Sequence, residues 1–135
     1  MQRVTRKTIE GEEPTSRARR VRLTETTVPS ALERATHAFA QEGLASLSRI
    51  DLRDTLERQT DRDIGPYWLI EVCHPALAAH GLSGDRMAGL DSCRQVAVWQ
   101  DGRDAIVATL ARPPGGGRGG SLEEHVDRAL GRLSG

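Results

Sequence analysis

The sequence of 135 residues has few aromatic side chains, which make up 3% of it. The large rings are limited to Phe39, Tyr67, Trp68 and Trp99, so Leu, Val, Ile and Ala must fill most of the core. Hydrophobic residues make up 37% and charged residues 28%, which excludes a fibrous repeat and a chain disordered throughout. This length favours one domain with a single core.

The sequence also lacks a long apolar run. Its longest runs, such as 67–70, are too short to span a bilayer, and no apolar segment follows the early charges as a secretory signal requires. We therefore expect a cytoplasmic protein without a membrane partner. Cys73 and Cys93 are accordingly expected to be free thiols and not a structural disulfide.

Neither sign of charge is in excess, because 19 Lys and Arg residues balance 19 Asp and Glu residues. This balance argues against a nucleic-acid partner, which is typically bound through a basic surface. The signs are unevenly distributed, since residues 1–22 hold seven basic and three acidic side chains. Residues 1–20 also have little apolar content, so we expect a disordered basic leader before a single domain over 21–135.

Alternation of apolar and polar residues indicates five strands. The strand over 66–73 is apolar on both faces, which favours an internal position in a sheet. Asp101-Gly102 predicts a hairpin turn between the last two strands. The predicted strands cover 20–26, 44–50, 66–73, 94–100 and 105–110.

Capping residues and glycines mark the predicted helices. Ser30 and Glu33 have the spacing of a capping box, and so do Ser121 and Glu124 before the last helix. The predicted helices cover 30–43, a short turn capped by Asp51, 75–81 and 121–133. Loops are expected over 60–65 and 83–92.

A Gly- and Pro-rich segment over 112–120 has almost no side chain to bury and is expected to be a flexible linker before the last helix. That helix carries one apolar stripe, which must dock on the rest of the domain. The stripe consists of Leu122, Val126, Ala129, Leu130 and Leu133. Together these elements predict an α+β fold, a small antiparallel sheet with helices packed mainly on one side, in the order β-α-β-(short α)-β-α-β-β-α.

The main candidate for chemistry is Cys73-His74-Pro75, between a strand and a helix, together with Cys93. If the strands that end at Cys73 and begin at Cys93 are antiparallel neighbours, both thiols lie at the same sheet edge. Cys73 also lies just before a helix, where the positive end of the helix dipole stabilises a thiolate.

This pair allows three interpretations. The first is that the cysteines simply pack in the core, as free cysteines commonly do. They are alternatively a redox or sulfur-handling pair, with Cys73 as nucleophile, Cys93 as resolving thiol and His74 or Glu71 as tuning group. A third interpretation is a metal or haem site formed by Cys73, His74 and Cys93.

The other titratable residues near this pair have plainer interpretations. Glu71 lies on the strand face of Cys73, where it is either a general base or a carboxylate on a partly solvated face. His37 and His125 are interpreted as solvated or flanking residues, and His74 also suits a helix cap.

The sequence contains no phosphate-binding loop and no nucleophile elbow, so it does not favour an enzyme and assigns no cofactor or catalytic residue.

From about Val21 to Pro113 the chain resembles the bacterial domain of unknown function family 302. The resemblance rests on an ordered set of residues: Gly43, Ile50-Asp51 before Leu52 and Leu56, Pro66-Tyr67, Cys73-x-Pro75, Ala78, Leu82, and Cys93 before Val96-Ala97-Val98. Two positions depart from the family pattern, which usually has Asn at His74 and Pro at Ser92.

The resemblance implies an antiparallel α+β domain that commonly forms a homodimer, with Cys73 and Cys93 matching two family cysteines. The family has no established activity. We therefore favour a homodimeric binding or regulatory module with a pocket for a small molecule or partner near the two cysteines. The thiol-dependent protein and the metal or haem site are the alternatives.

Overall fold

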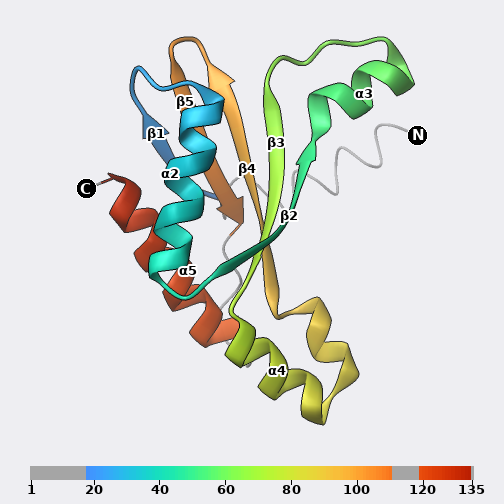
Figure 1. Cartoon of the computed structure of the whole chain (residues 1–135), viewed down its shortest axis with the longest axis vertical. Helices are drawn as coiled ribbons and strands as arrows, with labels where there is room; N and C mark the ends of the chain where they lie inside the picture. The colour runs from blue at the N-terminus through green and yellow to red at the C-terminus, as the bar shows by residue number, and fades with distance from the viewer. Residues whose placement is uncertain (1–17, 111–118, 135) are drawn as a thin grey trace, which may run out of the picture.

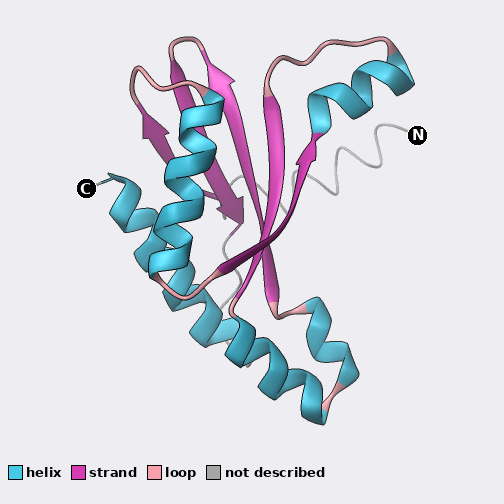
Figure 2. Ribbon diagram, viewed as in Figure 1, coloured by secondary structure: helices cyan, strands magenta, loops and turns pink. Residues whose placement is uncertain are grey.

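The computed structural model describes residues 18–110 and 119–134. Five strands form one antiparallel sheet in the order β1-β5-β4-β3-β2, as Figures 1 and 2 show. The elements are β1 (Ala18–Leu23), α2 (Val28–Gln41), β2 (Ala45–Asp51), α3 (Leu52–Thr60), β3 (Tyr67–Cys73), α4 (Pro75–Gly84), the 3₁₀ helix η2 (Arg86–Leu90), β4 (Cys93–Asp101), β5 (Asp104–Leu110) and α5 (Gly119–Ser134). The predicted α+β class and element order are confirmed, and η2 is added to them.

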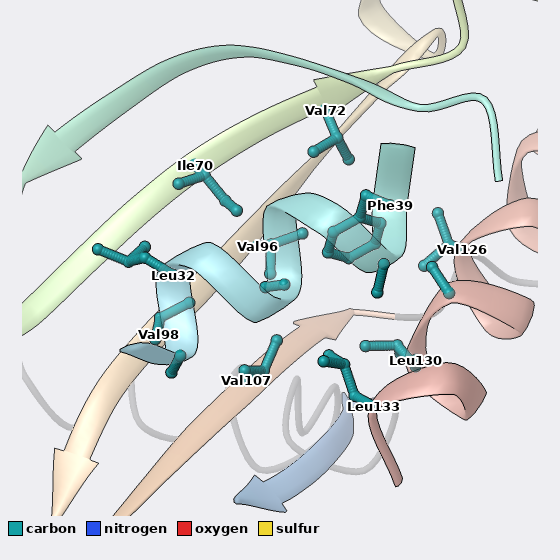
Figure 3. Close-up of a cluster of buried hydrophobic side chains, with 14 of the residues drawn as sticks. Leu32, Phe39, Ile70, Val72, Val96, Val98, Val107, Val126, Leu130 and Leu133 are labelled. Atoms are coloured by element: carbon teal, nitrogen blue, oxygen red, sulfur yellow. The ribbon is translucent and has the colours of Figure 1, made fainter. Parts of the chain in front are cut away.

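The core lies between one face of the sheet and the two long helices, α2 and α5, which also contact each other. Figure 3 shows Phe39 of α2 between Val96 of β4 and Val126 of α5. All five residues of the predicted apolar stripe on α5 are buried, so the expectation that this stripe docks on the domain is confirmed. Within the described ranges, no helix is long and apolar enough to cross a membrane.

Two helix boundaries differ from the prediction. The prediction of a capping box at Ser30 is wrong, because Thr27 is the N-cap of α2. The Thr27 side chain accepts a hydrogen bond from the Ser30 backbone N–H. Gly81 does not end α4, which continues to Gly84. A Cβ at Gly81 would lie 3.2 Å from the Ala88 side chain, so this glycine allows η2 to pack closely on α4.

The predicted loop at 83–92 contains η2, and the last helix begins at Gly119, two residues before the predicted capping box. Residues 18–20 of the predicted leader belong to β1, and residues 119–120 of the predicted linker belong to α5. The rest of both segments lies outside the described residues. Asp51 caps α3 as expected, because its carboxylate accepts from the Asp54 backbone N–H at 3.1 Å.

Candidate functional site at the base of the α4–η2 arm

Cys73 and Cys93 lie directly opposite each other in the register of β3 and β4. Their Cα atoms are 4.2 Å apart, and the two residues form a disulfide. The expectation that the thiols meet at one sheet edge is confirmed, whereas the expectation that they are free is wrong. That expectation came from the absence of export features, which carries no information on strand register.

The two sulfur-bearing residues differ in accessibility. Cys73 is 4% exposed, whereas Cys93 is half-buried. Cys73 immediately precedes His74, the N-cap of α4, so negative charge on its sulfur would be stabilised by the N-terminal end of that helix. An incoming thiol would therefore attack Cys93, and Cys73 would leave as the thiolate that is better stabilised.

Between the two cysteines the chain leaves the sheet as a helical arm, residues 74–92, which we call the α4–η2 arm. It projects from the end of β3 and β4 in Figure 1. No residue of α4 is buried, and α4 packs mainly against η2. Met87 and Leu90 on η2 are 65% and 73% exposed. The disulfide thus closes the base of an arm that has few contacts with the core.

His74 joins the arm to two other parts of the domain. Its Nδ1 accepts a hydrogen bond from the Leu77 backbone N–H at 3.3 Å, so the prediction that it caps a helix is confirmed. Its ring lies 4.5 Å from the ring of His125 on α5, measured between centroids. No spacing in the sequence indicated this contact of His125, which depends on the docking of α5.

Gly43 lies beside the His74 ring, and its replacement by alanine is expected to destabilise the protein by about 1–2 kcal/mol. Gly43 has φ +79°, and a Cβ there would lie 3.3 Å from His74 Nε2. The matched control is Gly131→Ala in α5, where a Cβ meets nothing within 4 Å. Since alanine favours a helix more than glycine, that variant should gain up to about 1 kcal/mol in urea unfolding. Equal effects of the two substitutions would contradict the prediction.

Glu71 lies on the same strand face as Cys73 and is half-buried, with Gln95 and Ser48 as its neighbours in the register. Its role as a tuning group stays a prediction. In the described ranges, no group of three or more His, Cys, Asp or Glu side chains is placed to hold a metal. Disulfide sulfurs also offer no thiolate to a metal, so the metal or haem interpretation applies only to the reduced chain.

A surface depression in the described part of the chain lies on the arm and is lined by residues 82–86. These residues lie at the far end of α4, which at 1.5 Å per residue is about 15 Å from its start beside the disulfide. The depression is therefore not the predicted pocket at the cysteine pair, which stays a prediction.

Arg94, which follows Cys93 on β4, is not among the site residues predicted from the sequence. Its side chain is 7% exposed and pairs with Glu123 of α5, with 2.7 Å between Nη1 and Oε1. The other oxygen of Glu123 accepts from Arg19 of β1 at 2.6 Å. A signal was available, because period-two alternation places Arg94 on the inward face of Val96 and Val98.

A family model described as domain of unknown function DUF302 matches residues 19–133. Among solved structures, the chain is similar to an uncharacterised conserved DUF302 protein from Bacillus stearothermophilus. The two share 19% sequence identity and a TM-score of 0.73, over 87% of this chain and 98% of that chain. This likeness shows the fold. No curated protein matches the sequence.

Proposed function

The chain belongs to the DUF302 family, and we propose that it is a redox-responsive module in which Cys73 and Cys93 interconvert between a dithiol and a disulfide. The observation that carries the proposal is the direct pairing of the two cysteines at the base of the α4–η2 arm. This pairing favours the thiol-dependent interpretation over simple packing of two free cysteines.

The chemistry of the proposal is thiol–disulfide exchange with a low-molecular-weight thiol. The thiolate of this reductant attacks Cys93 Sγ, which breaks the bond to Cys73 and releases Cys73 as a thiolate. A second reductant thiolate then attacks the mixed disulfide, releases the Cys93 thiolate and leaves as an oxidised dimer. Two electrons pass to the protein, and each released thiolate takes a proton from water according to its pKa.

The difference in burial between the two cysteines sets the direction of attack. It gives each thiol the role that the sequence predicts for the other. Cys93 is the more exposed of the two cysteines, and Cys73 lies beside the N-terminus of α4. In the oxidising direction Cys93 forms the mixed disulfide, and the buried Cys73 resolves it. A reversible disulfide of this kind is compatible with the cytoplasmic location that we propose, because cytosolic disulfides are typically transient.

A redox titration of the full chain tests this proposal. The protein is equilibrated with glutathione buffers of varied ratio, trapped with a maleimide and analysed by mass. We expect one two-electron transition in which both thiols appear together. Cys73→Ser and Cys93→Ser are matched controls that leave one thiol and should show no such transition. A disulfide that stays intact at every ratio until the chain unfolds would show a structural bond and contradict the proposal.

A second candidate function is that of a homodimeric binding module. Its two copies would contact each other through the sheet face opposite α2 and α5. Tyr67 and Trp99 stack there, with ring centroids 5.5 Å apart, and Ile50 and Leu110 on the same face are 45% and 47% exposed. Apolar side chains grouped on one sheet face favour contact with a second copy, which would cover them.

Sedimentation at tens of micromolar protein tests the homodimer. We expect the mass of a dimer for the native chain and of a monomer for Ile50→Asp. Met87→Asp is the matched control, because Met87 is 65% exposed on the arm and not on this sheet face. A monomeric native chain, or equal effects of the two substitutions, would contradict this candidate.

A further inference from the structure

Arg94 is a buried charge whose hydrogen bonds are only half satisfied. The residue is 6% exposed, and its Nη1 donates to Glu123 Oε1 at 2.7 Å and to the Leu110 carbonyl at 3.3 Å. Its Nε and Nη2 atoms are also buried, and neither has a partner among the described residues. Burying such donors without an acceptor is unfavourable, and it is more unfavourable when the group is charged.

The two unsatisfied donors form one edge of the guanidinium, the edge that binds two oxygens of an anion side by side. The same edge is filled elsewhere in this chain. Arg53 donates through Nε and Nη2 to the two oxygens of Asp63, at 2.8 and 3.0 Å. That contact, with a third hydrogen bond from the Gly65 backbone N–H, lowers the pKa of Asp63 to about 2. Arg94 presents the same edge without a carboxylate.

We propose that the Nε–Nη2 edge of Arg94 binds a small anion through two of its oxygens, either a carboxylate or a tetrahedral oxoanion. The charges of Arg94 and Arg19 are balanced by those of Glu123 and Asp127, so an added anion would meet no net negative charge from these four side chains. Helix α5 also begins at Gly119, four residues before Glu123, so its positive end lies in this region.

The anion site is separate from the disulfide. Arg94 and Cys93 are consecutive in β4, so their side chains point to opposite faces of the sheet. Arg94 lies opposite the buried Val72 in the register, on the face that α5 covers. The anion is thus a ligand in its own right and not the substrate of the two thiols, and the site stands whether or not the redox proposal does.

The test follows the side-chain Nε–H resonance of Arg94 in the full ¹⁵N-labelled chain, assigned by its absence in Arg94→Lys. Sulfate, phosphate and acetate are added separately at equal ionic strength, with chloride as reference. We expect a saturable shift for at least one of the three, which also distinguishes tetrahedral anions from carboxylates. At a concentration about a hundredfold above Kd, the same anion should raise Tm by about 10 °C.

Arg94→Lys should lose the rise in Tm, because lysine offers no two-donor edge. Arg53→Lys is the matched control and should keep it, since the corresponding edge of Arg53 already holds Asp63. A resonance that moves equally with chloride, or that moves with none of the anions, would overturn the proposal and assign the edge to water. The resonance is read on the native chain, so this outcome stands even if Arg94→Lys fails to fold.

Discussion

Replacing Phe39 with alanine is expected to lower the free energy of unfolding by about 3–5 kcal/mol, the usual cost of emptying a buried aromatic site. Phe39 is fully buried in the core between α2, α5 and the sheet, whereas Trp68, which also packs against this core, is only partly buried. The surrounding side chains include Val96 and Val126, which are themselves fully buried and have little freedom to close the cavity.

Urea unfolding followed by circular dichroism measures this effect. Phe39→Leu fills most of the volume and should cost clearly less than Phe39→Ala. His37→Ala is the matched control, because His37 is exposed on the same helix and its change should stay within about 0.5 kcal/mol. A loss below about 1 kcal/mol for Phe39→Ala would show that the core rearranges around the missing ring.

The parts of the fold that sequence predicted well depend on short-range patterns. Alternation along β3, the Asp-Gly turn before β5 and the apolar stripe of α5 are each set by residues a few positions apart. These patterns also decide which face of an element is buried, so they predicted the placement of helices on one side of the sheet. They fix the element order without fixing which strands pair.

Helix ends were predicted less well, because several residues compete for one terminus. Thr27 and Ser30 both carry a hydroxyl suited to an N-cap, and only the extended backbone at Thr27 settles the choice. Gly81 matches a helix stop in sequence, yet its position under Ala88 is set by the packing of η2. Such contacts appear only when elements distant from the local pattern are in place.

The residues of the candidate site divide in the same way, between those marked by short-range patterns and those that depend on long-range contacts. Sequence reasoning identified Cys73, Cys93 and the cap at His74, since each is marked by its residue type and its place beside a predicted element. It did not identify the contact with His125 or the pair of Arg94 and Glu123, because both require α5 to lie against the end of the sheet. Long-range pairs of this kind leave no spacing to recognise.

Reduction of the disulfide is expected to lower the free energy of unfolding by about 3 kcal/mol. The two cysteines are 20 residues apart, so the bond removes the entropy of a loop of that size from the unfolded chain. By linkage, the disulfide of the folded protein should be harder to reduce than that of the unfolded chain, by about 60 mV. Urea unfolding with and without reductant measures the change.

A double variant, Cys73→Ala with Cys93→Ala, provides the control and should unfold at the same urea concentration in both conditions. Because α4 has no buried residue, we expect reduction to raise hydrogen exchange first in the α4–η2 arm, while the buried strand residues stay protected. A loss below about 1 kcal/mol on reduction, or an equal rise in exchange throughout the sheet, would contradict a disulfide that acts on the arm. If hydrogen exchange instead rises only in the arm, the redox state of the two cysteines controls the mobility of the arm beside the sheet.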